Sequence, residues 1–268
     1  MEIEINNLNF SYNEEEILKN INLKIDKEKI TGIIGKSGSG KTTLIDLISG
    51  LLNTSSGIIK YDKKETIDLK NIGYCFQNSK SQFFYDTVKK EIESSAIINN
   101  YRVNELDKRI NDVLKIVKLK QDILSKNPSD LSQSEAKKLA LANILIYNPK
   151  LIILDEPTIG LDSNSKEELV RLLKMLKNKY KKTIIIVSHD LNFLHRIVDN
   201  VITLYNGEVV INGPKYEVFN DTKRLKKYGL LPPYIMMFSN KVYTKKGIKI
   251  GYRDEINDLI KDIYRNVY

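Results

Sequence analysis

The 268-residue sequence has a single cysteine and no tryptophan. Cys75 cannot form an internal disulfide, so a reducing, cytoplasmic setting is the simplest interpretation. No apolar run reaches about 18 residues, and no segment is therefore expected to span a membrane. The first ten residues, MEIEINNLNF, are acidic and alternating, which argues against a signal peptide. Internal repeats and low-complexity linkers are absent as well.

The charge balance is basic but uneven. The net charge is +9, and residues 222–268 hold eleven Lys and Arg against four Asp and Glu. A basic tail can face nucleic acid, anionic lipid or an acidic partner, and a solvated face explains it equally well. No stretch interleaves basic residues with aromatic ones, as a nucleic-acid platform needs, so no nucleic-acid partner is expected.

Residues 35–43 read GKSGSGKTT and fit the P-loop pattern of a Gly, four residues and Gly-Lys-Thr. The glycines let the backbone curl around an anion, and the following helix N-terminus favours negative charge. Lys41 can reach the β- and γ-phosphates of a nucleotide, and the Thr42 hydroxyl can hold Mg²⁺. An apolar run at 29–34 predicts a buried strand before the loop, and helical spacing follows it to about Gly50. This stretch predicts nucleotide binding.

Apolar runs predict the remaining elements. Strands are expected at 3–12, 23–25, 57–61, 71–76, 151–154 and 183–187, with a type I′ hairpin over 201–211 around Asn206-Gly207. Helical spacing dominates 87–147, with a break at 127–129 and a new helix from Leu131-Ser132, and 77–85 is expected to be a loop. Helical segments between apolar strands predict a parallel sheet with crossovers.

The C-terminal part is expected to begin at a boundary near 229–233. A final helix follows, with an apolar stripe for which we expect ordinary packing on the domain. The stripe consists of Ile256, Leu259, Ile260 and Ile263.

Two acidic residues follow the apolar run at 151–154. Asp155 is placed to reach the Mg²⁺ that Thr42 binds, and Glu156 can polarise an attacking water as a general base. An apolar run that ends in Asp-Glu is a weak signal alone, but it is a strong one at this distance after a P-loop.

His189 and Gln77 also end strands. His189 can donate a hydrogen bond to phosphate and to the attacking water, whereas His195 lies within a helical pattern and is expected to be structural. Gln77 has the reach to touch metal or water, and a solvated loop glutamine is its alternative interpretation.

These residues, in this order, resemble the motifs of ABC-transporter ATPases over residues 1 to about 218. Residues 35–43 resemble Walker A, and residues 151–156 resemble Walker B with its catalytic glutamate. Residues 131–135 stand where the LSGGQ signature belongs, and Gly160-Leu161-Asp162 resembles the D-loop. Gln77 resembles the glutamine of the Q-loop, His189 resembles the switch histidine, and Tyr12 resembles the aromatic residue that stacks on adenine.

The resemblance implies an α/β fold: a P-loop NTPase (ABC ATPase) core with an antiparallel β subdomain, a helical subdomain near 87–147 and a small C-terminal extension. It divides the chain into a nucleotide-binding domain at 1–220 and an extension at 221–268. Two such chains would sandwich two ATP molecules, each between one chain's Walker A and the other chain's signature.

The resemblance also assigns roles to individual residues, with ATP and Mg²⁺ as the ligands. The implied ATP-binding residues are Tyr12, Gly35, Lys36, Ser37, Gly38, Ser39, Gly40, Lys41, Thr42, Thr43 and Gln77. The implied metal-binding residues are Thr42, Gln77 and Asp155, and the catalytic residues are Glu156 and His189. Ser132, Gln133, Ser134 and Glu135 would act on the partner's site, and Asp162 belongs to the D-loop.

A narrower resemblance is to the energy-coupling factor (ECF) branch. It rests on Gln77-Asn78 with Gln82-Phe83, Thr87-Val88 with Glu91-Ile92, Gly213-Pro214 with Glu217-Val218-Phe219, and LKKYGLLPP at 225–233. In that branch the C-terminal extension takes part in dimer contacts. The branch imports vitamins, cobalt or nickel with a transmembrane T-component and a substrate-binding S-component. This implies a peripheral protein on the cytoplasmic face of the cell membrane.

The signature departs from the family. Gln133 and Ser134 replace two glycines, and their Cβ atoms obstruct close backbone approach. Glu135 places a negative charge where the family has a neutral amide. We therefore expect the site that contains this signature to hydrolyse ATP poorly, which favours a heterodimer with a paralogue that carries LSGGQ.

Three alternatives stay open: the ATPase of another type of ABC transporter, a low-turnover nucleotide-binding regulatory subunit, and an ABC protein that acts on ribosomes or DNA. The altered signature motivates the second. Proteins of the third kind usually carry two cassettes or a long coiled-coil insertion, and this chain has neither.

Overall fold

A six-stranded sheet forms the centre of the computed structural model, which describes residues 1–66, 68–99, 105–248 and 251–267. Its strand order is β5-β6-β7-β3-β8-β9, with parallel pairing from β5 to β8 and antiparallel pairing of β9 with β8. The strands are β3 (Ile30–Gly35), β5 (Ile72–Cys75), β6 (Leu151–Asp155), β7 (Thr183–Val187), β8 (Asn200–Tyr205) and β9 (Glu208–Pro214). The parallel sheet with crossovers is as the sequence predicted.

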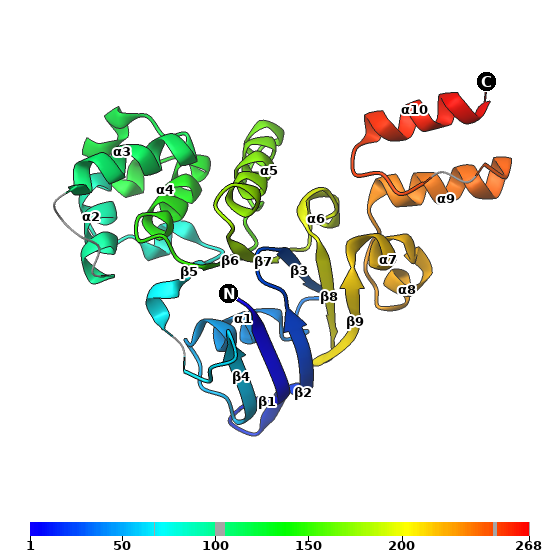
Figure 1. Ribbon diagram of the computed structural model, residues 1–268, viewed down its shortest axis with the longest axis horizontal. Helices are drawn as coiled ribbons and strands as arrows, with labels where there is room; N and C mark the ends of the chain where they lie inside the picture. The colour runs from blue at the N-terminus through cyan, green and yellow to red at the C-terminus, as the bar shows by residue number, and fades with distance from the viewer. Residues whose placement is uncertain (67, 100–104, 249–250, 268) are drawn as a thin grey trace.

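Both faces of the central sheet are covered, which explains why its strands are continuously apolar rather than alternating. In β6, Ile152 and Leu154 pack into the core beneath the helices, whereas Leu151 and Ile153 pack into the core shared with the small sheet. Figure 1 shows these two layers on opposite sides of the strands. The predicted α/β class with a P-loop NTPase core is confirmed.

The small sheet is antiparallel, in the order β2-β1-β4. It consists of β1 (Ile3–Tyr12), β2 (Glu15–Ile25) and β4 (Ser56–Tyr61). The prediction that the second strand covers only 23–25 is wrong, because β2 begins at Glu15, which pairs with Tyr12. The first half of β2 has few apolar residues because one of its faces is exposed. Pairing with β1, rather than burial, makes this half part of the strand.

The predicted hairpin between β8 and β9 is present. Asn206 has φ 50° and Gly207 has φ 83°, the positive values that a type I′ turn requires at both central residues. The turn also joins the two sheets, because the N–H of Lys19 in β2 donates to the Gly207 carbonyl at 2.9 Å.

Helices cover one face of the central sheet. α2 (Val88–Ile98), α3 (Leu106–Val117) and α4 (Gln133–Leu145) form a group beside β5 and β6, followed by α5 (Ser163–Asn178) and α6 (Leu191–Ile197), whereas α1 (Lys41–Ser49) lies on the other face (Figure 1). The predicted helical span 87–147 includes 100–104, which lie outside the described residues. Short 3₁₀ turns occupy Leu69–Asn71, Ser79–Gln82, Gln121–Ser125 and Pro128–Asp130, so the expected loop at 77–85 contains one turn of helix.

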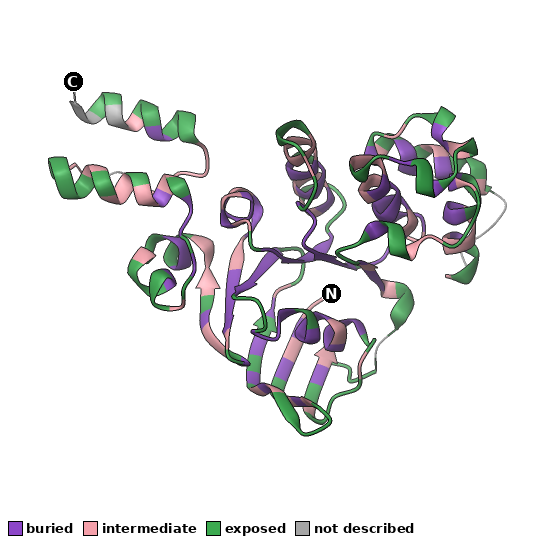
Figure 2. Ribbon diagram, turned by 180° about the vertical axis from the view of Figure 1, so that it is seen from behind, coloured by how far each residue is buried: buried purple, intermediate pink, exposed green. Residues whose placement is uncertain are grey.

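The C-terminal part consists of α7 (Lys215–Asn220), α8 (Thr222–Lys227), α9 (Tyr234–Lys246) and α10 (Ile256–Val267). In Figures 1 and 2, α9 and α10 project away from the sheets. The expectation that the stripe on α10 packs on the domain is wrong for two of its residues: Leu259 is buried, but Ile256 and Ile260 are exposed. Among the described residues, no helix is long and apolar enough to cross a bilayer.

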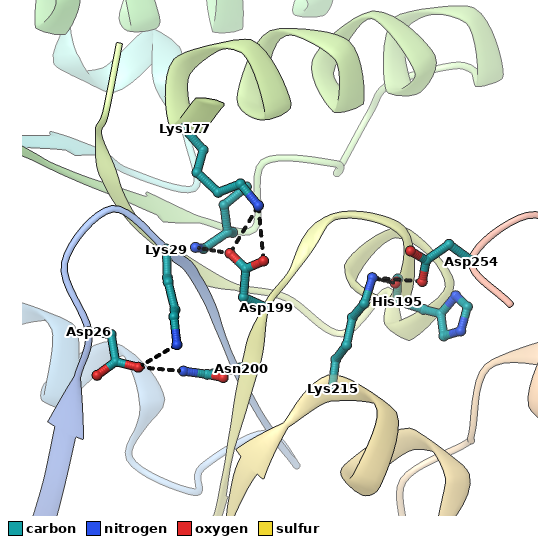
Figure 3. Close-up of polar contacts among 9 residues, drawn as sticks. Asp26, Lys29, Lys177, His195, Asp199, Asn200, Lys215 and Asp254 are labelled. Atoms are coloured by element: carbon teal, nitrogen blue, oxygen red, sulfur yellow. Dashed lines mark hydrogen bonds and ion pairs between the residues drawn. The ribbon is translucent and has the colours of Figure 1, made fainter. Parts of the chain in front are cut away.

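Charged side chains hold the segment before α10 against the core (Figure 3). Lys215 Nζ donates to Asp254 Oδ1 at 2.6 Å and to the His195 carbonyl at 3.3 Å, and Arg196 contacts Glu255 at 3.2 Å. The buried His195 ring lies 4.9 Å from the Tyr252 ring. The segment therefore docks on α6 and on the start of α7.

A second polar cluster anchors the beginning of β3 (Figure 3). The Ile30 N–H donates to Asp199 Oδ2 at 2.8 Å, and Lys177 Nζ of α5 donates to Asp199 Oδ1 at 2.9 Å. This carboxylate fixes the P-loop strand relative to α5.

We expect low pH to reduce the free energy of unfolding through His195. Its burial lowers its pKa to about 4, so below the ordinary pKa the unfolded chain takes up a proton that the folded chain excludes. This stabilising contribution is complete above pH ~6.5 and is lost as the pH falls toward ~4, by up to roughly 3 kcal/mol. Urea unfolding across this range should be less pH-dependent in His195→Phe than in wild type. Equal profiles for wild type and His195→Phe would contradict the assignment.

We also expect Gly207→Ala to destabilise the junction between the sheets. A Cβ at Gly207 would lie 2.3 Å from the Ile17 carbonyl oxygen, whereas a Cβ at Gly38, which also has positive φ (76°), meets nothing within 4 Å. Gly38→Ala should cost about 1 kcal/mol for its backbone conformation, and Gly207→Ala roughly 2 kcal/mol more. Equal losses of the free energy of unfolding would show that the Ile17 contact is unimportant.

Candidate functional site

The candidate site lies where three parallel strands end together. Asp155 at the end of β6 pairs with Val187 at the end of β7, which in turn pairs with Ile33 of β3. The residues that follow these strands are the loop 36–40, Glu156, and Ser188 with His189. Carboxyl ends of parallel strands are where open α/β sheets place their ligands.

The loop after β3 is shaped by its glycines. Gly35 approaches neighbouring groups so closely that a Cβ would lie 2.4 Å from the Leu204 carbonyl oxygen and 2.5 Å from Ser39 Oγ. Gly40 has φ 94° and is the N-cap of α1, and it provides no side-chain cap. The N–H groups of the first turn of α1 are therefore left for another acceptor, which suits an anion.

Lys41 is the first residue of α1, and its side chain is buried. Its Nζ donates to the Gly35 carbonyl at 3.0 Å and to the Lys36 carbonyl at 2.8 Å. Burial lowers the pKa of Lys41, and the carboxylates of Glu156 and Asp155 oppose that change. The loop carbonyls thus hold an ammonium group beside two acidic residues.

Thr42 and Asp155 form an oxygen pair suited to Mg²⁺. Thr42 Oγ1 lies 3.4 Å from Asp155 Oδ2. Burial and the neighbouring Glu156 raise the pKa of Asp155 to about 6, although the Thr42 hydroxyl and the Lys41 ammonium oppose this change. A divalent cation would offset both effects, and it prefers hard oxygen ligands, so these residues fit Mg²⁺. Gln77 is exposed, and its predicted contact with metal or water stays a prediction.

Glu156 has a strained backbone, with φ 46°, which a non-glycine residue rarely adopts. Its Oε2 accepts hydrogen bonds from Ser188 Oγ and from the His189 N–H, both at 3.2 Å. Its Oε1 is buried and lies 3.5 Å from His189 Nε2. Hydrogen bonds to Oε2 therefore hold the carboxylate in place, and Oε1 faces the half-exposed imidazole of His189.

Two residues that support Glu156 were not predicted. Lys137 Nζ of α4 donates to the carbonyls of Glu156 and Pro157 at 3.2 and 3.0 Å, and Ser188 is buried beneath the carboxylate. Ser188 could have been found because it follows an apolar strand directly. Lys137 carries no local signal, since its role depends on how α4 packs against β6.

The segment 132–135 begins α4 with a capping box. Glu135 Oε2 accepts from the Ser132 N–H at 2.9 Å and from the Ser132 hydroxyl at 2.7 Å, while Ser132 Oγ accepts from the Glu135 N–H at 3.2 Å. These hydrogen bonds from Ser132 lower the pKa of Glu135. The Ser132 hydroxyl is therefore occupied inside its own helix, next to an ionised carboxylate.

Of the other two residues of this segment, Gln133 lies against the segment before α5 and Ser134 against its first turn. A Cβ at Gly160 would lie 2.4 Å from Gln133 Oε1, and Ser134 Oγ lies 3.1 Å from Ser165 Oγ. Asp162 caps α5 by accepting from the Ser165 N–H at 2.7 Å. The segments 132–135 and 160–162 thus form one surface.

The remaining predicted ligand residues lie in the loop and the first turn of α1, except Tyr12. Lys36, Ser37 and Gly38 are exposed, whereas Ser39 and Thr43 are buried. Tyr12 ends β1, is half exposed, and packs edge-on against Phe10 with ring centroids 4.9 Å apart. Its ring is thus accessible to a planar ligand, and stacking on adenine stays a prediction.

Comparisons with known proteins agree with this geometry. A family model described as ABC transporter matches residues 18–159. The energy-coupling factor transporter ATP-binding protein EcfA2 of Caldanaerobacter subterraneus subsp. tengcongensis is 37% identical over 263 residues, which cover 93% of this chain and 92% of the relative.

Solved structures are similar as well. CbiO1 of Clostridium perfringens, part of the ABC transporter complex cbiONQ, has a TM-score of 0.75 at 30% identity and covers 91% of this chain and 95% of its own. The ABC cassette MJ0796 in a post-hydrolysis state with ADP and Pi has a TM-score of 0.71 at 30% identity, covering 80% of this chain and 98% of its own.

We expect Glu135→Ala to lower the free energy of unfolding by about 1 kcal/mol, because it removes one half of the capping box. Glu135→Gln should cost much less, since glutamine can accept the same backbone hydrogen bond. Urea unfolding of both variants would measure the difference. Equal stability of the alanine variant and wild type would show that the box contributes nothing.

Proposed function

The chain belongs to the ABC transporter family as one of its ATP-binding subunits, and from that premise we propose that it hydrolyses ATP to drive an ECF-type membrane importer. The observation that carries the proposal is the meeting of Lys41, Asp155, Glu156 and His189 at one edge of the sheet. Vitamins or transition-metal ions are the proposed cargo class.

Each residue at this edge has a proposed role in hydrolysis. The loop 35–43 and the N-terminus of α1 bind the phosphates, and the Lys41 ammonium balances their charge. Glu156 accepts the proton of the attacking water, and the hydrogen bonds from Ser188 and the His189 N–H orient its carboxylate for that step. The His189 side chain, half exposed and 3.5 Å from Glu156 Oε1, donates to the γ-phosphate.

Mg²⁺ would be held by Thr42 and Asp155, with Gln77 as a further proposed ligand, and it would neutralise charge on the phosphate oxygens. A cation at this position would lower the pKa of Asp155, which burial and Glu156 raise. Tyr12 is proposed to stack on the adenine, and Asp162 to belong to the surface that meets the partner.

We propose a second cassette chain as the partner. In a homodimer, both sites would contain Ser132, Gln133, Ser134 and Glu135, and in both the Ser132 hydroxyl would be held by its own helix. The ionised Glu135 would also repel the γ-phosphate. A paralogue with LSGGQ would supply a signature without this negative charge to this chain's intact Walker A.

The remaining proposals concern the assembly. A transmembrane T-component and a substrate-binding S-component complete the importer, and the chain lies on the cytoplasmic face of the membrane as a peripheral subunit. The divisions at 1–220 and 221–268 are proposed as the nucleotide-binding domain and the extension. The hydrogen bonds that hold the Glu156 side chain and backbone in place favour this function over that of a regulatory subunit with low turnover.

The proposal predicts that the purified chain alone hydrolyses Mg²⁺-ATP negligibly, and that mixing it with an LSGGQ-bearing cassette chain from the same genome produces marked activity. Glu156→Gln in this chain should reduce the activity of the mixture by at least about 100-fold while ATP stays bound. Phosphate release and retained nucleotide would be measured together.

The matched variant rebuilds the signature by combining Gln133→Gly, Ser134→Gly and Glu135→Gln. It should raise the activity of the chain alone. Full activity of the unmodified chain alone would refute the heterodimer, and wild-type turnover by the Glu156→Gln mixture would refute the assignment of the base.

A further inference from the structure

A cavity of about 340 Å³ lies between the helical group and α5, on the helix-covered face of the central sheet. Figure 1 shows α5 standing beside the group that contains α3 and α4. Its interior is formed mainly by aliphatic side chains, among them Ile116, Val117, Leu141, Leu154, Leu169 and Leu172. This size and apolar character are typical of sites for small molecules. None of the residues assigned to phosphate, Mg²⁺ or water lines it, but Ser134 of the segment 132–135 and Lys137, which supports Glu156, do.

Charged residues around this apolar interior are almost all cationic. The lining includes four lysines and one arginine but a single acid: Lys115, Lys118, Lys137, Lys138, Arg171 and Glu168. Glu168 pairs with Lys138 at 2.8 Å and with Lys118 at 3.6 Å. Lys137 is already bound to backbone carbonyls.

The other two cations are Lys115 and Arg171. Arg171 interacts only electrostatically with Glu167, which pairs with Arg196. Both are exposed, and no ion pair holds either of them within the described part of the chain. Lys115 lies near the end of α3 and Arg171 lies in the middle of α5, so the two cations reach the cavity from the two helix groups that bound it.

We propose that this cavity binds a single-chain amphiphile with a carboxylate head, a free fatty acid by chemical class. The acyl chain would fill the aliphatic interior, and the carboxylate would lie between Lys115 and Arg171. Arginine can engage a carboxylate with two parallel hydrogen bonds, which favours this head group over a diffuse charge. The occupant would lie between α4 and α5, beside the Ser134–Ser165 contact at 3.1 Å.

The chain carries its own reporter for this site. Cys75 is the only cysteine and lines the cavity, where its thiol lies 3.9 Å from Ser79 Oγ. Burial raises the pKa of this thiol to about 11, so it reacts slowly, and an occupant would shield it further.

The test is alkylation of Cys75 by N-ethylmaleimide, followed by intact mass, in the full-length protein with laurate below its micelle concentration. Laurate should slow the reaction at least tenfold. Dodecyltrimethylammonium, which has a similar tail and a cationic head, should protect little. Combining Lys115→Glu with Arg171→Glu should weaken laurate protection about tenfold, which equals about 1.4 kcal/mol. The control that combines Lys223→Glu with Lys226→Glu in α8 should behave as wild type.

Fluorescence provides a second measurement if the Cys75 thiol reacts too slowly for its alkylation to be followed. The chain has no tryptophan, so Ile116→Trp places the only indole at the cavity, and its fluorescence should respond to laurate with the same dependence on charge. Equal effects of both amphiphiles, no effect of laurate in either measurement, or protection only by phosphatidylglycerol vesicles would overturn the proposal.

Discussion

The parallel alignment of β3, β6 and β7 is the constraint on which the site depends. Because neighbouring strands pair in register, the residues after Gly35, Asp155 and Val187 must emerge at one edge. The side chains there are charged, and the strands beneath them are buried on both faces. The apolar core therefore buries a cation and two carboxylates side by side: burial lowers the pKa of Lys41 and raises that of Asp155, and the opposite charges counteract both changes.

The strain at Glu156 follows from the same arrangement. The chain must leave β6 and present a carboxylate to the site, and the backbone does so through a left-handed conformation. The Glu156 N–H donates to the Val187 carbonyl at 2.8 Å, and Lys137 holds the carbonyls on the other side. Neighbouring elements thus stabilise a conformation that the residue alone would avoid. Lys137 lies in the helix that begins with Ser132, so the turn at Glu156 is tied to the segment proposed to act on the partner's nucleotide.

The segment 132–135 is both a helix cap and part of a surface. A serine followed three residues later by glutamate favours a helix N-terminus. Ser132 and Glu135 form both hydrogen bonds of this capping box. The same hydrogen bonds occupy the Ser132 hydroxyl, which is proposed to act on the partner's nucleotide. Local stability and the proposed chemistry therefore compete at this position, which is the physical reason to expect a division of labour between two different chains.

Much of the fold was determined by local patterns in the sequence. The glycines at 35, 38 and 40, the continuous apolar runs before Asp155 and Ser188, and the Asn206-Gly207 pair dictate loop, strands and turn because each depends on neighbours in the chain. Only the tertiary structure decided the support of Glu156 by Lys137, the packing of Gln133 on Gly160, the length of β2 and the exposure of Ile256 and Ile260. Those features involve residues that are distant in sequence, or they depend on which face of a helix or strand packs against another element. Periodicity cannot reveal them, because it reports that a face is apolar and not what covers it.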